Sequence, residues 1–235
     1  MDLPWLPLRQ PSAYHYGLDS LALLAFIAQQ PDVPQSWCDL GAGCGILASA
    51  CARFWPDSSG LALERQPEFL TSLQHNLPAG VEIVIGDVRD YAYGKRDLFV
   101  CNPPYFPPNR KKSSPTRMRD TCRQTWFGGL NHFWQAVQAH LNPGGSFYGI
   151  GPPPLVWPFL APMEGFYEAK PIASFVDQTP SLICFRLGQM PLGLDQTPLI
   201  LFDTPGCLSK LGKRFFEPVT KLIPGFASFS SLALQ

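Results

Sequence analysis

Three glycines at alternate positions follow an acidic residue, in the run Asp39-x-Gly41-x-Gly43-x-Gly45. The run lies between an expected buried strand and an expected helix, where glycines let the backbone turn tightly and approach a ligand. This spacing differs from the Gly-x-Gly-x-x-Gly pattern that holds a pyrophosphate, and the acid would repel a phosphate. The motif favours a cationic or hydroxyl-bearing ligand, although a glycine-rich turn with a capping aspartate would also fit it.

Two further acids stand at the ends of the next two expected strands. Glu64 can accept hydrogen bonds from both hydroxyls of a ribose, and Asp87 can accept from an exocyclic amine. Either residue alone would be an ordinary surface turn residue. Acids at three successive strand ends, beside a glycine loop, favour a nucleoside site at the carboxyl edge of a sheet.

The fourth expected strand ends in Asn102-Pro103-Pro104-Tyr105. The two prolines exclude regular structure and favour an extended turn. The Asn102 side-chain oxygen and the Pro103 carbonyl can each accept a hydrogen bond from a planar NH2 group, and the Tyr105 ring can stack on its plane. A proline-rich loop with a capping asparagine would explain any one residue, but not the position of all four beside the acids.

The candidate residues above stand at the ends of expected strands that alternate with expected helices. This alternation predicts a mostly parallel α/β sheet with helices on both faces. Asp19 and Ser20 precede an apolar run and are expected to cap a helix that ends near Pro31. Strands are expected at residues 36–40, 60–63, 81–85, 97–101 and 147–150, and further helices at 46–54, 67–77 and 130–141.

We expect a single domain over residues 1–235, with an arm and helix (1–30), a core (36–150) and a C-terminal part (151–235). Prolines after Gly151 argue against a long helix there. Residues 172–176, 181–187 and 198–202 are expected to be antiparallel strands at one edge of the sheet. Residues 203–235 are expected to form a short packed or frayed tail.

The formal net charge is zero, from 18 basic and 18 acidic residues, which argues at first against a nucleic-acid partner. Residues 110–123, however, contain six basic residues and one acid, a local charge of +5 that leaves −5 on the rest of the chain. Neutrality is therefore a cancellation and does not exclude an anionic partner.

No apolar run approaches the roughly 18 residues of a membrane span. The acid at position 2 and the lack of a basic start predict no signal peptide, and the seven scattered cysteines suggest reduced thiols and no zinc site. A cytoplasmic location is expected.

Residues 39–45, Glu64, Asp87 and the Asn102–Tyr105 corner together resemble the ordered motifs of class I S-adenosylmethionine-dependent methyltransferases that methylate amino groups. The resemblance covers about residues 36–150. It implies a Rossmann-like seven-stranded sheet, mostly parallel, with its last strand antiparallel. It also implies S-adenosylmethionine as the cofactor, held by Asp39, Gly41, Gly43, Gly45, Glu64 and Asp87.

Within that class, the flanking segments resemble bacterial tRNA adenine-N6 methyltransferases. The resemblance rests on residues 14–26, on Phe106 after the corner, and on residues 198–203. It implies RNA, most readily tRNA, as the partner, and Asn102, Pro103, Pro104 and Tyr105 as the catalytic corner that holds an adenine amine. A base in folded RNA must be splayed or flipped to reach such a corner.

The basic segment after the corner is expected to contact the phosphates around the target base, although a solvated loop is the simpler explanation of a charge run. The expected substrate-binding residues are Phe106, Arg110, Lys111, Lys112, Arg117 and Arg119. Two alternatives use the same corner: a protein glutamine N5-methyltransferase, and an rRNA guanine N2-methyltransferase. The short segment before the first helix counts against the first.

Overall fold

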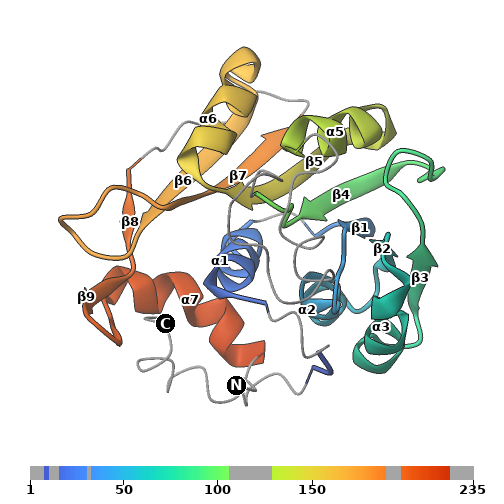
Figure 1. Cartoon of the computed structure of the whole chain (residues 1–235), viewed down its shortest axis with the longest axis horizontal. Coiled ribbons are helices and arrows are strands. Elements are labelled where there is room, and N and C mark those ends of the chain that lie inside the picture. Colours follow the sequence, from blue (N-terminus) through green and yellow to red (C-terminus); the bar gives the residue numbers. More distant parts are fainter. Residues whose placement is uncertain (1–7, 11–15, 31–32, 106–128, 189–196, 223–235) are drawn as a thin grey trace, which may run out of the picture.

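The computed structural model describes residues 8–10, 16–30, 33–105, 129–188 and 197–222. These residues form a sheet of eight strands in the order β3-β2-β1-β4-β5-β7-β6-β8, covered by helices on both faces (Figure 1). The strands are β1 (Ser36–Leu40), β2 (Ser59–Glu64), β3 (Val81–Ile85), β4 (Arg96–Cys101), β5 (Leu141–Gly151), β6 (Tyr167–Ala173), β7 (Leu182–Gly188) and β8 (Leu199–Ile200). The expected Rossmann-like, mostly parallel sheet is confirmed, with the short strand β8 added to the seven implied strands.

Strands β1 to β5 run parallel to one another, so their carboxyl ends meet at one edge. β1 and β4 are neighbours although β2 and β3 come between them in the chain, and the chain therefore reverses its direction of winding at β1. Ligands of open α/β sheets bind at such a switch point.

The prediction of three antiparallel C-terminal strands is wrong in part. Only β7 is antiparallel to its neighbours, β5 and β6, whereas β8 pairs in parallel with β6. The reason is the short helix α6 (Pro153–Leu160), which follows β5 and lets β6 start again in the direction of β5. Prolines in its first turn are compatible with this helix, because the first N–H groups of a helix have no partner within it.

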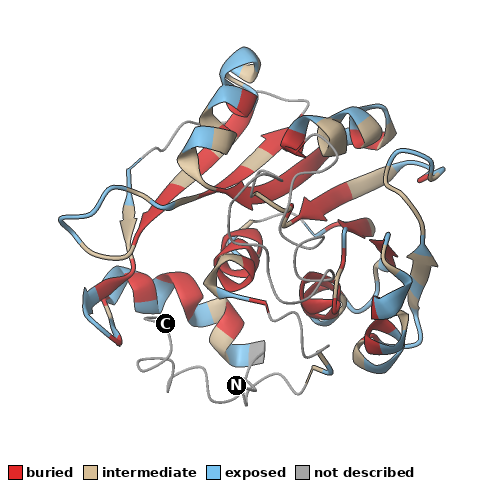
Figure 2. Cartoon of the chain, in the orientation of Figure 1, coloured by how far each residue is buried: buried red, intermediate tan, exposed pale blue. Residues whose placement is uncertain are grey.

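The helices divide the core into two layers. α1 (Leu18–Ile27), α2 (Ile46–Phe54), α3 (Leu70–Asn76) and α7 (Lys210–Leu222) cover one face of the sheet, and α5 (Gly129–Val137) and α6 cover the other (Figure 1). Alternate strand residues serve the two layers: Trp37 belongs to the α1 side, and Cys38 and Leu40 belong to the α5 side. Buried residues fill the central strands, and exposed ones lie on the outer faces of the helices (Figure 2).

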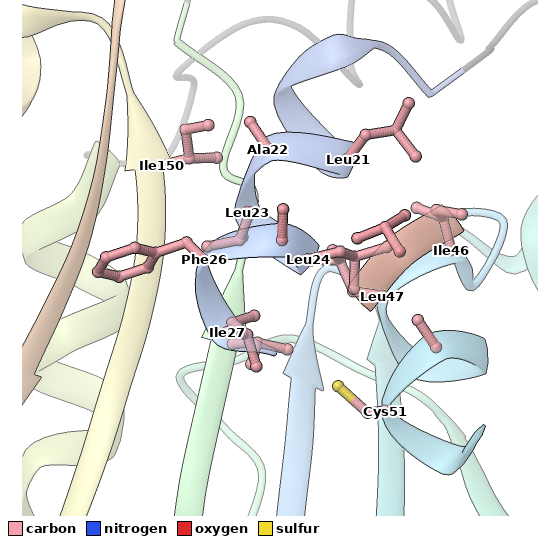
Figure 3. Close-up of a cluster of buried hydrophobic side chains, with 14 of the residues drawn as sticks. Leu21, Ala22, Leu23, Leu24, Phe26, Ile27, Ile46, Leu47, Cys51 and Ile150 are labelled. Carbon is pink, nitrogen blue, oxygen red and sulfur yellow. The ribbon is translucent and has the colours of Figure 1, made fainter. Parts of the chain in front are cut away.

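Beyond Asp19 and Ser20 in its first turn, helix α1 is apolar on every side, and it lies in the middle of its layer. Leu21 and Leu24 lie beside Ile46 and Leu47 of α2, while Phe26 points toward β5 (Figure 3). Phe26 and Tyr148 of β5 make an edge-to-face ring contact at 6.1 Å between centroids. This packing fixes the first turn of α1 relative to the carboxyl ends of β1 and β4.

The expectation of a tail after residue 203 is wrong for its described part. A small ribbon, β9 (Phe202–Thr204) with β10 (Cys207–Leu208), leads into the 13-residue helix α7. Ser209 caps this helix, since its Oγ accepts the Gly212 N–H at 2.8 Å. Phe216 and Val219 are fully buried in the layer that contains α1, so burial outweighs the proline inside the helix.

Among the described residues, no helix is both long and apolar enough to cross a membrane.

Candidate active site

The parallel strands bring the predicted site residues to one edge of the sheet. β1 runs into the glycine loop, β2 ends at Glu64, Asp87 follows β3, and Asn102 follows β4. In the β1–β4 pair Asp39 lies opposite Val100, so Asn102 is two residues beyond a direct partner of Asp39. The structure therefore places all four segments at the carboxyl edge.

The glycine loop has a backbone that ordinary residues rarely adopt. Gly41 has a φ of +72° and Gly45 a φ of +86°. A Cβ added to Gly45 would come within 3.1 Å of Leu73 in α3, so this glycine lets the loop pack closely on that helix. A Cβ added to Gly41 would meet no atom of the described residues within 4 Å. The loop is thus packed on one side and open at Gly41.

Glu64 is buried and tied to this loop. Its Oε2 accepts the Gly43 N–H at 2.8 Å, and its Oε1 accepts the Gln66 N–H at 2.8 Å. Burial raises the pKa of the Glu64 carboxyl. Each oxygen keeps a further lone pair, so the carboxylate can still accept hydrogen bonds from the hydroxyls of a ribose.

Asp39 has one oxygen satisfied and one without a partner in the described part of the chain. Its Oδ2 accepts the Ala48 N–H of the first turn of α2 at 2.9 Å, while Oδ1 is buried and makes no hydrogen bond. Desolvation raises the pKa of Asp39 to about 7. A lone buried carboxylate oxygen beside an open glycine loop fits a cationic ligand.

Asp87 lies beside Glu64, because the Gly86 N–H donates to the Glu64 carbonyl at 2.9 Å. Its carboxylate accepts two hydrogen bonds from the Arg89 guanidinium, of 2.8 and 2.7 Å, and one from the Arg89 backbone N–H at 3.0 Å, and Arg65 approaches to 3.9 Å. These hydrogen bonds lower the pKa of Asp87 to about 2. Asp87 is therefore ionised and paired, with capacity left to accept from an amine.

The corner after β4 contacts the first turn of α1. The Asn102 Nδ2 donates to Ser20 Oγ at 2.9 Å, and the Tyr105 hydroxyl donates to Asp19 Oδ2 at 2.6 Å. The same hydroxyl is within hydrogen-bond distance of Asn102 Oδ1. Asn102, which is expected to hold the acceptor amine, and Tyr105, whose ring is expected to stack on it, thus belong to one hydrogen-bond network.

The prediction that Asp19 and Ser20 cap α1 is wrong. Gly17 is the N-cap residue, no side chain of the described residues caps this end, and both Asp19 and Ser20 lie inside the first turn. Sequence reasoning missed their contact with the corner. The available signal was a pair of polar residues at the start of an otherwise apolar helix, with Ser20 only 1% exposed.

Six predicted substrate-binding residues lie outside the described residues and stay predictions: Phe106, Arg110, Lys111, Lys112, Arg117 and Arg119.

The model of the methyltransferase small domain family matches residues 16–120. The matched segment includes the glycine loop, Glu64, Asp87 and the corner after β4.

Among solved structures, the fold is similar to a predicted O-methyltransferase from Agrobacterium tumefaciens, with a TM-score of 0.64, 17% identity, and coverage of 85% of this chain and 96% of the other. It is also similar to a 16S rRNA guanine N2-methyltransferase from T. thermophilus in complex with S-adenosylmethionine and guanosine. That likeness has a TM-score of 0.53, 22% identity, and coverage of 75% of this chain and 44% of the other. At these identities the likeness establishes the fold.

Curated relatives are similar over part of their length. A 4-amino-L-phenylalanine methyltransferase from Streptomyces pristinaespiralis is 30% identical over 58% of this chain and 50% of its own. A tRNA1(Val) adenine(37)-N6-methyltransferase from Vibrio cholerae is 29% identical over 39% and 40%. A release factor glutamine methyltransferase from Geobacter sulfurreducens is 26% identical over 67% and 55%. The chain thus spans about half the length of these relatives.

Proposed function

We propose that this protein is an S-adenosylmethionine-dependent N-methyltransferase that methylates the exocyclic N6 amine of an adenine in RNA, with tRNA as the first candidate. The observation that carries the proposal is the position of Asn102 beside the glycine edge, two residues beyond the strand partner of Asp39. A hydrogen-bond acceptor there can hold an amine next to a methyl donor bound at the loop.

The cofactor end of the site is built from this chain's acids and glycines. Asp39 lies beside the open loop at Gly41, and Glu64 is aimed at the loop through Gly43. Asp87 can accept from the adenine amine of the cofactor. When bound, S-adenosylmethionine supplies a methyl group on a positively charged sulfur.

The acceptor end positions a nitrogen for in-line displacement. The Asn102 oxygen and the Pro103 carbonyl accept the two hydrogens of the amine, so its lone pair faces the methyl carbon. The nitrogen–carbon bond forms as the carbon–sulfur bond breaks, and the nitrogen then loses a proton to water. The two acceptors also offset the positive charge that develops on the nitrogen.

A planar, aromatic acceptor fits the ring at the end of the corner. Tyr105 is partly buried and held by Asp19, so it offers a fixed surface for stacking. Stacking of a base on an aromatic side chain contributes about 1–3 kcal/mol. The names of two relatives, for an adenine amine and for an aromatic amine, support an amine on a ring as the acceptor.

RNA as the partner is supported by the basic segment that follows the corner in the sequence. Residues 110–123 have a charge of +5 and directly follow the residues proposed to hold the base. Contacts from this segment to phosphates would add affinity that weakens with salt.

Incubation with methyl-labelled S-adenosylmethionine tests the proposal, using unmodified tRNA, rRNA and a release factor as separate acceptors. Nucleoside analysis is expected to place the label in N6-methyladenosine from tRNA. Label in N2-methylguanosine or in a release-factor glutamine would contradict the proposed acceptor in favour of one of the two alternatives.

A further inference from the structure

The Tyr105 hydroxyl is shared between two acceptor oxygens, one on Asp19 and one on Asn102. The Tyr105 hydroxyl lies 2.6 Å from Asp19 Oδ2 and also within hydrogen-bond distance of Asn102 Oδ1. A phenol has one proton, so it can donate to only one of these two oxygens at a time. The proton that reaches Asp19 is therefore withheld from Asn102.

Asp19 is held in place to receive that proton. Its Oδ1 accepts the Ser20 N–H at 2.7 Å, which leaves Oδ2 facing Tyr105. Gly17 leaves room for the carboxylate, because a Cβ there would come within 3.0 Å of Asp19 Oδ1. A carboxylate accepts more strongly than a neutral amide oxygen, so the phenol proton favours Asp19.

The second contact of Asn102 comes from the same turn of α1. Ser20 Oγ lies 2.9 Å from the Asn102 amide, and Ser20 is buried. Two adjacent residues of α1 therefore act on the Asn102 side chain. Ser20 contacts its amide group directly, and Asp19 acts on its carbonyl oxygen through Tyr105. Their position is set by the apolar packing of α1 against α2 and β5 (Figure 3).

We propose that Asp19 is a positioning residue for methyl transfer: by taking the Tyr105 proton, it spares the Asn102 carbonyl oxygen from sharing its two lone pairs between the phenol and the acceptor amine. The inference rests on the proposed role of Asn102 as the group that holds the amine, and it applies to any amine or amide acceptor. Loss of the carboxylate redirects the phenol proton to Asn102, where it takes one of the two lone pairs of the carbonyl oxygen and weakens the hydrogen bond that the oxygen accepts from the amine.

A double-mutant cycle tests this coupling. Asp19→Asn keeps the shape of the side chain and is expected to lower kcat on the order of 10-fold to 100-fold, with the Kd for S-adenosylmethionine unchanged. Tyr105→Phe keeps the stacking ring but removes the proton, so adding Asp19→Asn to Tyr105→Phe is expected to have no further effect. Independent, multiplicative effects of the two substitutions, or an unchanged kcat in Asp19→Asn, would overturn the proposal.

The side-chain amide of Asn102 gives a readout that needs no acceptor. Its NH2 signal in a ¹⁵N-labelled protein is assigned by its loss in Asn102→Asp. We expect Asp19→Asn to shift this signal in the wild-type background and to leave it in place in the Tyr105→Phe background. Equal shifts in both backgrounds, or none in either, would overturn the role of Asp19. If the wild type transfers no methyl group to RNA, the proposed function is wrong. The NMR measurement would still show whether Asp19 acts on Asn102 through Tyr105.

Discussion

The Oε2 atom of Glu64 accepts the backbone N–H of Gly43 at 2.8 Å, across the gap between the end of β2 and the glycine loop after β1. Two features that are 21 residues apart in the sequence therefore form one wall of the site. The carboxylate is aligned before any ligand arrives, which reduces the ordering that binding requires.

Glu64→Gln is expected to weaken S-adenosylmethionine binding. In the wild type the Gly43 and Gln66 N–H groups each donate to one oxygen of Glu64. Glutamine has only one acceptor oxygen, so its NH2 group must face one of these two donors. Loss of hydrogen bonds to a charged group costs about 1.5–3 kcal/mol, or roughly 10-fold to 100-fold in Kd. Calorimetric titration measures the change. The exposed Glu68→Gln is the control, and an equal loss of affinity in both would argue against a specific role for Glu64.

Comparison of Gly41→Ala with Gly94→Ala separates the effect of backbone strain on stability from the effect of an added methyl group on cofactor binding. Gly41 and Gly94 both have positive φ, +72° and +66°, and a Cβ at either meets no atom within 4 Å in the part of the chain that the structure describes. Each substitution should therefore cost about 1–2 kcal/mol of stability. Only Gly41→Ala is expected to weaken cofactor binding, because only that Cβ enters the open side of the loop. Equal cofactor affinity in the two variants would place the ligand elsewhere.

Asp39 is expected to make the fold less stable as the pH rises from about 4 to about 7. Its carboxyl has a pKa of about 7 in the folded chain against an ordinary value of 3.8, so the folded state binds more protons than the unfolded state in this range. The free energy of unfolding should fall by about 1.4 kcal/mol per pH unit for one such group. Glu64, whose pKa is also raised, acts in the same direction above its ordinary value.

Urea unfolding between pH 5 and pH 7 measures this slope. Asp39→Asn should make it shallower. Asp87→Asn is the control, since a pKa of about 2 makes the contribution of Asp87 disappear only as the pH falls from about 4 toward 2. A slope in Asp39→Asn as steep as that of the wild type would contradict the account of this buried carboxyl.

Charge reversal at Lys111, Lys112 and Arg117 should weaken RNA binding and flatten its dependence on salt. Each lost phosphate contact lowers the slope of log K against log salt by about 0.7–0.9. Reversal of three exposed basic residues on α7, Lys210, Lys213 and Arg214, changes the net charge equally and serves as the control. Fluorescence anisotropy at several salt concentrations gives both slopes. If the salt dependence became equally shallow in both variants, the effect would come from the overall charge of the protein and not from the basic segment.

Local signals predict the part of the fold that holds the cofactor edge. β3 and α2 have the predicted bounds, 81–85 and 46–54, because apolar runs there end at glycines or prolines that stop the element. The C-terminal part was mispredicted where tertiary packing outweighs local preference. Pro218 argues against a helix, yet burial of Phe216 and Val219 stabilises α7 around it.

The site divides in the same way. The position of the acids and glycines at one edge of the sheet could be predicted from the sequence, because each follows a recognisable strand. The contact between Asp19 and Tyr105 could not, because it joins residues 86 positions apart. At the sequence level, the polar pair Asp19 and Ser20 before an apolar run is equally typical of a helix cap. Only the packing of α1 over the sheet turns the pair toward Asn102.

Asn102→Ala tests the central claim most directly, that the corner after β4 holds the nitrogen that receives the methyl group. Turnover with labelled S-adenosylmethionine is expected to fall on the order of 100-fold or more, while the Kd for the cofactor changes by less than about twofold. The control is Asn142→Ala, whose side chain donates to Asp97 at the opposite edge of the sheet. Retained turnover in Asn102→Ala, or a loss that follows weaker cofactor binding, would contradict the account.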